Sequence, residues 1–93
     1  MLNDNPLLAF LGKRGRGAVV EALRRNRGRP LHVRELARLA DVAPMVASRA
    51  IRELGALRAV EVSRRGKLLA VSLDADTAAG AFLASVEVPD PPF

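Results

Sequence analysis

The chain has 93 residues, of which 49% are apolar, and carries 15 Lys and Arg residues against 10 Asp and Glu residues. That apolar content favours one small folded domain over global disorder. With no cysteine and a single histidine, the chain lacks the ligands for a disulfide or a His/Cys metal site, and we expect neither a metal nor a cofactor.

Positive charge is concentrated ahead of residue 68. All 15 Lys and Arg residues lie at or before Lys67, and the charged residues that follow are all acidic: Asp74, Asp76, Glu87 and Asp90. A basic body with an acidic end predicts a polyanionic partner for the body. The excess of Arg over Lys favours bidentate contacts to phosphate and guanine, although it is equally consistent with the base composition of the genome.

No stretch approaches the roughly 18 apolar residues of a membrane span. The apolar run Leu7–Leu11 precedes the charged residues instead of following them, which is unlike a signal peptide. We therefore expect no membrane partner and a cytoplasmic, nucleoid-associated protein.

Two helical segments are predicted before residue 26. The first, within residues 1–12, is a short helix or arm that starts near Pro6 and ends at Gly12. Its apolar cluster consists of Leu7, Leu8, Phe10 and Leu11. The second, at residues 13–25, is an amphipathic helix whose apolar stripe contains Val19, Val20 and Leu23.

Two short helices joined by a tight turn follow. In the first, the residues expected on the core side are Val33, Leu36, Leu39 and Ala40. His32 precedes Glu35 by three residues, the spacing of a capping box. The second helix starts at Pro44, stops at Gly55 and has a core side made of Ala47, Ile51 and Leu54. Because only residues 41–43 separate the two helices, they must cross steeply, as in a helix-turn-helix.

The apolar period then changes from 3.6 residues to 2. Val60 and Val62, and later Leu69, Val71 and Leu73, alternate with other residues, which predicts a β-hairpin with the tip SRRGK. A last helix is predicted from about Asp76 to Val86. The tail at residues 87–93 contains three prolines and is expected to be extended or disordered.

This order of elements predicts an α+β fold that is mostly α with a β-hairpin wing. A winged helix-turn-helix at residues 13–73 is flanked by the arm and by a C-terminal helix at residues 74–86. The stretch LHVRELARLADVAPMVASRAIRELGALRAVEVSRRGKLLAVSL resembles ArsR-like regulators, in which an ELA helix, a tight turn, a Pro-led SR helix and a basic wing follow one another. The sequence before it is similar to a winged-helix segment found alone or ahead of minimal nucleotidyltransferases.

The resemblance implies binding to double-stranded DNA. The implied recognition helix runs from Pro44 to Leu54 and points Met45, Ser48, Arg49 and Arg52 toward base edges. The implied wing contacts are Arg64, Arg65 and Lys67. The arginines expected at the DNA backbone are Arg27, Arg29, Arg34 and Arg38.

The sequence departs from this pattern around Pro44, where such regulators commonly carry Ser or Thr. Ala43, Met45 and Val46 stand there instead. The missing cap costs roughly 0.5–2 kcal/mol of helix stability, and there are fewer donors to read bases. Affinity for DNA as such is therefore better supported than sequence-specific reading.

Two glycine-rich basic stretches admit other interpretations. The segment NRGRP at residues 26–30 resembles an AT-hook, but its position between two packed helices favours a helix end followed by an extended segment. The segment GKRGRG at residues 12–17 lacks the spacing of a phosphate-binding loop, and no strand precedes it.

The leading hypothesis is a DNA-binding transcriptional regulator that acts as a homodimer. The apolar residues of the two terminal helices exceed the needs of a small winged core, so the interface is expected at Leu7, Leu8, Phe10, Leu11, Phe82 and Leu83. A nucleoid-type architectural protein and a protein-interaction module remain alternatives. An enzyme is not expected, because the sequence offers no carboxylate pair in a plausible cleft and no nucleophile beside a base.

Overall fold

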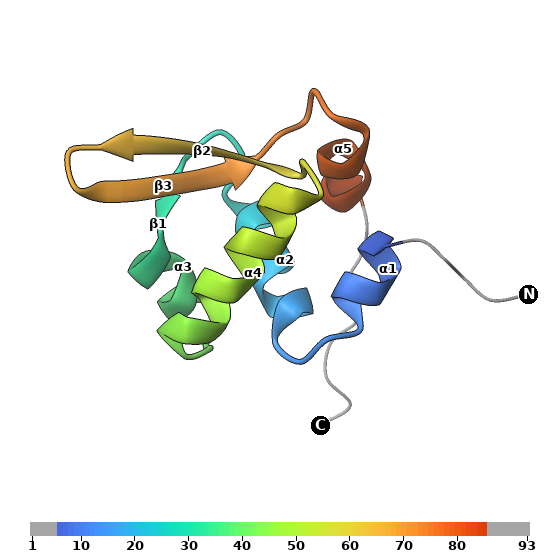
Figure 1. The fold of residues 1–93 in the computed structure, drawn as a ribbon, viewed down its shortest axis with the longest axis horizontal. Coiled ribbons are helices and arrows are strands. Elements are labelled where there is room, and N and C mark those ends of the chain that lie inside the picture. Colours follow the sequence, from blue (N-terminus) through green and yellow to red (C-terminus); the bar gives the residue numbers. More distant parts are fainter. Residues whose placement is uncertain (1–5, 86–93) are drawn as a thin grey trace, which may run out of the picture.

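A computed structural model describes residues 6–85, with the backbone alone for Pro6, Leu7, Leu8 and Arg65. Five helices and a three-stranded sheet alternate along this part of the chain (Figure 1). In chain order the elements are α1 (Pro6–Leu11), α2 (Arg16–Arg25), β1 (Leu31–His32), α3 (Val33–Ala40), α4 (Pro44–Ala56), β2 (Val60–Arg65), β3 (Leu68–Leu73) and α5 (Ala78–Ser85). Residue 86, where the last predicted helix ends, lies outside the described range, and so does the tail at residues 87–93.

The sheet is antiparallel with the strand order β1-β3-β2. Strands β2 and β3 form the predicted hairpin, in which Arg65 faces Leu68 across a two-residue turn. Gly66 begins this turn with a φ of +65°, a conformation that glycine adopts at no steric cost. The segment after Pro30, expected to be extended, forms β1 and pairs Leu31 with Val71.

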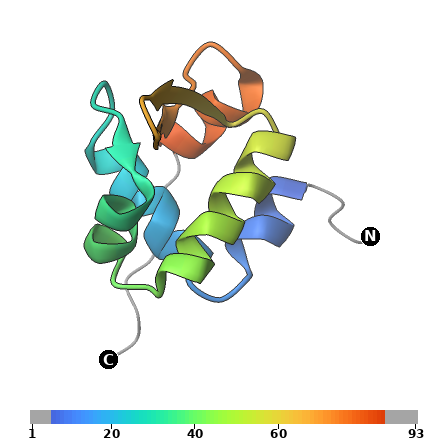
Figure 2. The same cartoon turned by 60° about the vertical axis from the view of Figure 1, so that its left-hand side comes forward.

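The core lies between the sheet and helices α2, α3 and α4 (Figures 1 and 2). Its largest fully buried side chains are Leu23, Leu31, Leu36, Leu54, Leu83, Val19, Val20 and Val71. Phe10 of α1 and Leu83 of α5 belong to the same cluster. Both terminal helices therefore complete the core of the single chain.

The predicted turn between α3 and α4 is confirmed. Asp41 adopts a left-handed φ of 56°, and its N–H donates to the carbonyl of Arg38 at 3.2 Å. The next N–H, of Val42, donates to the carbonyl of Ala37 at 3.0 Å. These two bonds form a Schellman motif, which ends α3 and turns the chain into α4.

Two details of these helices differ from expectation. Leu39 is 45% exposed, and the smaller Ala37 is buried in α3. Helix α4 does not stop at Gly55 but ends in a second Schellman motif, in which Arg58 takes the left-handed φ of 59°. There the N–H of Ala59 donates to the Leu54 carbonyl at 2.9 Å. The chain reverses at this point, which places Ala59 and Val60 in the core.

The expected alternation of buried and exposed residues along the hairpin is also wrong in its outer half. Val62 and Leu69 are 45% and 41% exposed, whereas Ala70, expected on the other face, is 2% exposed. The cause is that the hairpin extends past the helices, so that its outer half has no covering element among the described residues (Figure 1).

Helix α5 begins at Ala78, two residues later than predicted, because Thr77 caps it. The Thr77 hydroxyl accepts the Gly80 N–H at 3.0 Å and donates to the carbonyls of Arg58 and Asp74. Gly80 sits so close to this junction that a Cβ would overlap the Asp74 carbonyl and lie 2.9 Å from that of Ala59.

We expect Gly80→Ala to lower the free energy of unfolding by roughly 1–3 kcal/mol, since the added methyl meets backbone that cannot move aside. Gly55→Ala is the matched control. A Cβ at Gly55 meets nothing within 4 Å, and alanine should stabilise α4 there by about 0.5 kcal/mol. Urea denaturation followed by circular dichroism measures both, and equal effects would contradict the packing argument.

Candidate nucleic-acid interface

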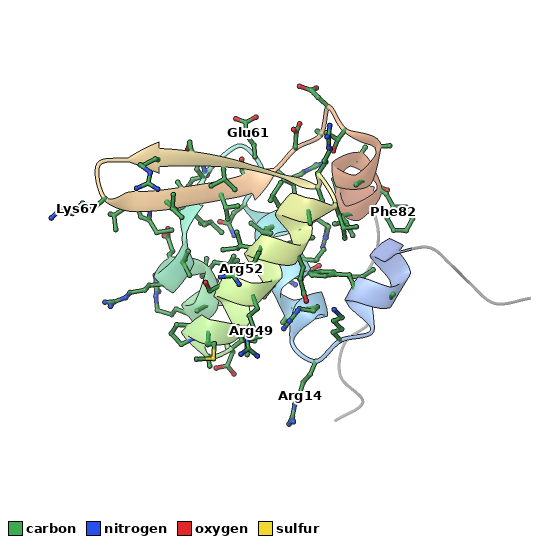
Figure 3. All side chains as sticks on the ribbon, viewed as in Figure 1. Arg14, Arg49, Arg52, Glu61, Lys67 and Phe82 are labelled. Carbon is green, nitrogen blue, oxygen red and sulfur yellow. The ribbon has the colours of Figure 1, made fainter. Side chains whose placement is uncertain are left out.

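Helix α4 divides into a buried and an exposed face. Ala47, Ala50 and Leu54 are fully buried. Ile51, expected with them, is half-buried. The four residues predicted to face bases, Met45, Ser48, Arg49 and Arg52, are all exposed, Met45 to 64%. The helix therefore presents a mixed surface of one thioether, one hydroxyl and two guanidinium groups. The guanidinium groups of Arg49 and Arg52 are labelled in Figure 3.

The first turn of α4 lacks a side-chain cap, as the sequence predicted. Ala43 occupies the N-cap position in an extended conformation and offers no side-chain hydrogen bond. Val46 is half-buried, and its Cγ1 is 3.1 Å from an ideal Cβ built on Gly15, so it packs on the loop before α2. Of the two apolar residues that follow Pro44, Met45 alone faces outward.

The basic residues fall into two sets, and those of the first set form ion pairs within the chain. Glu53 binds Arg16 at 2.8 Å and Lys13 at 3.0 Å. Glu21 binds Arg24 at 2.7 Å and Arg25 at 2.6 Å, and Glu35 binds Arg29 at 3.3 Å. These cations belong to α2 and to the loops on either side of it.

The second set has no such partners. Its members are exposed and form no ion pair with any residue between positions 6 and 85: Arg14, Arg27, Arg34, Arg38, Arg49, Arg52, Arg58, Arg64 and Lys67. Most of them lie on α3, α4 and the wing. The uncompensated charge is thus concentrated around the exposed face of α4.

Hydrogen bonds set the charge of the two bridging carboxylates. The bonds from Arg24 and Arg25 lower the pKa of Glu21 to about 2. Those from Arg16 and Lys13 lower the pKa of Glu53 below its ordinary value of 4.5. Both carboxylates are therefore ionised at neutral pH and keep the first set of cations paired.

An open groove lies between the wing and the two helices of the helix-turn-helix. Its volume is about 1040 Å³, and its lining includes Arg34, Arg38, Met45, Ser48, Lys67, Leu68 and Leu69. His32 borders it, and Nδ1 of its ring is 3.3 Å from the Leu69 carbonyl oxygen. His32 does start α3, but its side chain makes no capping bond, so the predicted capping box does not form.

The arginines of the wing and of NRGRP differ in their surroundings. Arg64 and Lys67 are exposed, and Lys67 lies at the tip (Figure 3); the side chain of Arg65 lies outside the described part. Arg27 is exposed in the turn before β1, whereas Arg29 binds Glu35. Gly28 takes a φ of +83° in this turn. NRGRP is thus a folded connection between α2 and β1.

Two of the residues expected at a dimer interface are buried in the core of the single chain instead. Phe10 and Leu83 are 3% and 0% exposed in the single chain. The argument that they exceed the needs of the core is therefore wrong. Leu11 and Phe82 are half-buried against the core, while the side chains of Leu7 and Leu8 lie outside the described part. Dimerisation itself stays a prediction.

No protein-family model matches the chain, and no curated protein matches it. Solved structures do. The crystal structure of the S. aureus MepR–DNA complex aligns with a TM-score of 0.65 over 87% of this chain, at 17% sequence identity. The fold is that of a winged helix. The chain spans 65% of the length of that MepR chain, and the ArsR-like assignment stays a prediction.

None of the described helices combines the length and apolarity that a membrane crossing requires. Within the described residues there is also no group of three or more His, Cys, Asp or Glu side chains placed to hold a metal ion.

Sequence reasoning missed two features of the interface. Glu53 was not recognised as the partner of Lys13 and Arg16, which lie 40 and 37 residues away in the chain. Arg14 was not placed beside α4. Neither the Glu53 ion pairs nor the position of Arg14 has a local sequence signal, because both depend on how α2 and the loop before it pack on α4.

We expect Glu53→Gln to lower the free energy of unfolding at pH 7 by about 1 kcal/mol, a modest value because the side chain is 32% exposed. The folded pKa of Glu53 lies below the unfolded one. Its contribution is therefore complete above pH 4.5 and is lost as the pH falls through the folded pKa. In urea titrations, the difference in the free energy of unfolding between variant and parent should therefore shrink as the pH falls below 4.5.

Glu61→Gln is the control. Glu61 is exposed on the wing and has no ion pair with a described residue. Its substitution should change stability little at any pH. A Glu53→Gln effect that is the same at pH 7 and pH 3 would contradict the role of the ion pairs.

Proposed function

We propose that the protein is a double-stranded DNA-binding transcriptional regulator that places α4 in the major groove and its wing against the flanking backbone. One observation carries this proposal. The described cations of α3, α4 and the wing have no acidic partner among the described residues, whereas five of the cations on and beside α2 do. The structural likeness to a chain solved in complex with DNA supports the same conclusion.

The exposed face of α4 suits a major groove, which is about 12 Å wide and admits one helix. Arg49 or Arg52 donates two hydrogen bonds to O6 and N7 of a guanine, and Ser48 donates to or accepts from a base or phosphate. Met45 provides an apolar surface for a thymine methyl group. Arg34, Arg38 and Lys67 around the groove contact phosphates, which fix the register of the helix on the duplex.

A homodimer is part of the proposal, because symmetric dimers are the commonest oligomers. Two copies would present their recognition helices to half-sites about 34–36 Å apart. The half-buried Leu11 and Phe82, with Leu7 and Leu8, are the residues proposed for the interface. The proposal places the protein in the cytoplasm, on the nucleoid, and assigns it no enzymatic activity.

Two other functions have specific support. A nucleoid-type architectural protein fits the lack of hydroxyl donors at Ala43, Met45 and Val46. A protein-interaction module fits the exposed apolar residues Met45, Leu68 and Leu69 around the groove. The packing of Val46 on Gly15 weakens this second alternative, because Val46 is not available to a partner.

We expect Arg49→Ala and Arg52→Ala to weaken binding to a selected duplex by about 1–3 kcal/mol each, and to relax the base preference at one position. The duplex would be obtained by selecting bound fragments from random DNA at physiological salt, and affinities measured by fluorescence anisotropy.

Arg58→Gly serves as the control. It removes the same charge at the far end of α4, and glycine readily adopts the left-handed conformation found there. Equal losses for all three variants on every sequence would rule out base reading by α4 and favour the architectural protein. Failure to bind any 30-bp duplex at low salt would favour the protein-interaction module.

A further inference from the structure

The loop between α1 and α2 is packed against the recognition helix. Gly15 has a φ of +78°, and an ideal Cβ built on it lies 3.1 Å from Val46 Cγ1 and 3.3 Å from Val42 Cγ1. A backbone bond from the Arg16 N–H to the Lys13 carbonyl, at 3.1 Å, closes the loop on itself. Its position relative to the first turn of α4 is therefore fixed by direct contact.

Three cations lie in the loop or directly after it, and two of them are ion-paired with the same carboxylate. Glu53 of α4 binds both Lys13 and Arg16. Arg16 also donates from Nη1 to the Arg14 carbonyl at 3.3 Å, which holds the backbone of Arg14 in place. The Arg14 side chain is exposed and forms no ion pair with a described residue. Arg14 is thus the one cation of this loop left for an external anion.

Arg14 lies on the other side of α4 from the wing. Figure 3 shows its side chain directed away from the body, with Arg49 between Arg14 and Lys67. A helix in a major groove has one phosphate backbone along each of its flanks. The wing and α3 lie on one flank of α4, and Arg14 offers a cation on the other.

From this arrangement we infer that Arg14 is a phosphate contact, and that the loop at residues 12–15 is a second DNA-backbone contact element opposite the wing. The inference rests on the proposed function and extends it. Lys13 and Arg16 both bind the one carboxylate of Glu53, so Arg14 is the cation of this element with no ion pair among the described residues. It contacts phosphate and reads no bases.

The test compares Arg14→Ala with Lys13→Ala in the full chain. Both remove one positive charge from adjacent exposed positions, but Lys13 is already bound to Glu53. The affinity for a 30-bp duplex is measured by anisotropy between 50 and 200 mM NaCl. Arg14→Ala should lower the slope of log K against log[NaCl] by about 0.9. Its loss of affinity relative to the parent chain should therefore change roughly threefold across this range. Lys13→Ala should leave the slope unchanged.

Two further measurements sharpen the result. The Arg14→Ala loss should be the same for duplexes of different sequence, since phosphates carry no base identity. Arg14→Lys should restore the slope, because a phosphate contact needs only the charge, and equal melting temperatures would show that all variants are folded.

The outcomes separate this inference from the function on which it rests. If Arg14→Ala and Lys13→Ala have the same slope while Arg49→Ala still weakens binding, the second contact element is refuted and DNA binding stands. If the parent chain binds no duplex at 50 mM NaCl, both are refuted.

Discussion

Glu53 connects the stability of the fold to the charge of its surface. It lies on the recognition helix, and its carboxylate reaches across to Arg16 and Lys13 at the start of α2. This contact joins α2 to α4 close to the point where Gly15 packs on Val46. It also pairs two cations at the start of α2, so that six of the nine unpaired cations among the described residues lie on α3, α4 and the wing. One side chain thus contributes both to the contact between the two helices and to the distribution of charge on the surface.

Much of the fold was predictable because its signals are local. The turn at residues 41–43 follows from the short spacing between two amphipathic helices, and Gly66 marks the hairpin. The errors arose where distant elements decide the outcome. Gly55 has the chemistry of a helix end, but the chain must reverse three residues later to bury Ala59, so Arg58 adopts the left-handed conformation instead.

The candidate interface was predictable to a similar extent. The family resemblance, together with the helical spacing of the apolar residues, placed Ser48, Arg49 and Arg52 on the exposed face of α4. Periodicity could not show which cations are paired, because the Glu53 contacts join residues that are 37 and 40 positions apart. Nor could it distinguish core from interface at Phe10 and Leu83, as both environments select the same apolar residues. Their burial became evident only when the terminal helices were packed.

The strand order β1-β3-β2 has a consequence for association between copies of the chain. Strand β2 is an edge strand: its outer backbone groups have no partner strand among the described residues. Such an edge can recruit a strand from another molecule and start aggregation. Charged side chains interrupt it at Glu61 and Arg64, both exposed. Charged side chains on an edge strand disfavour such pairing between copies of the chain.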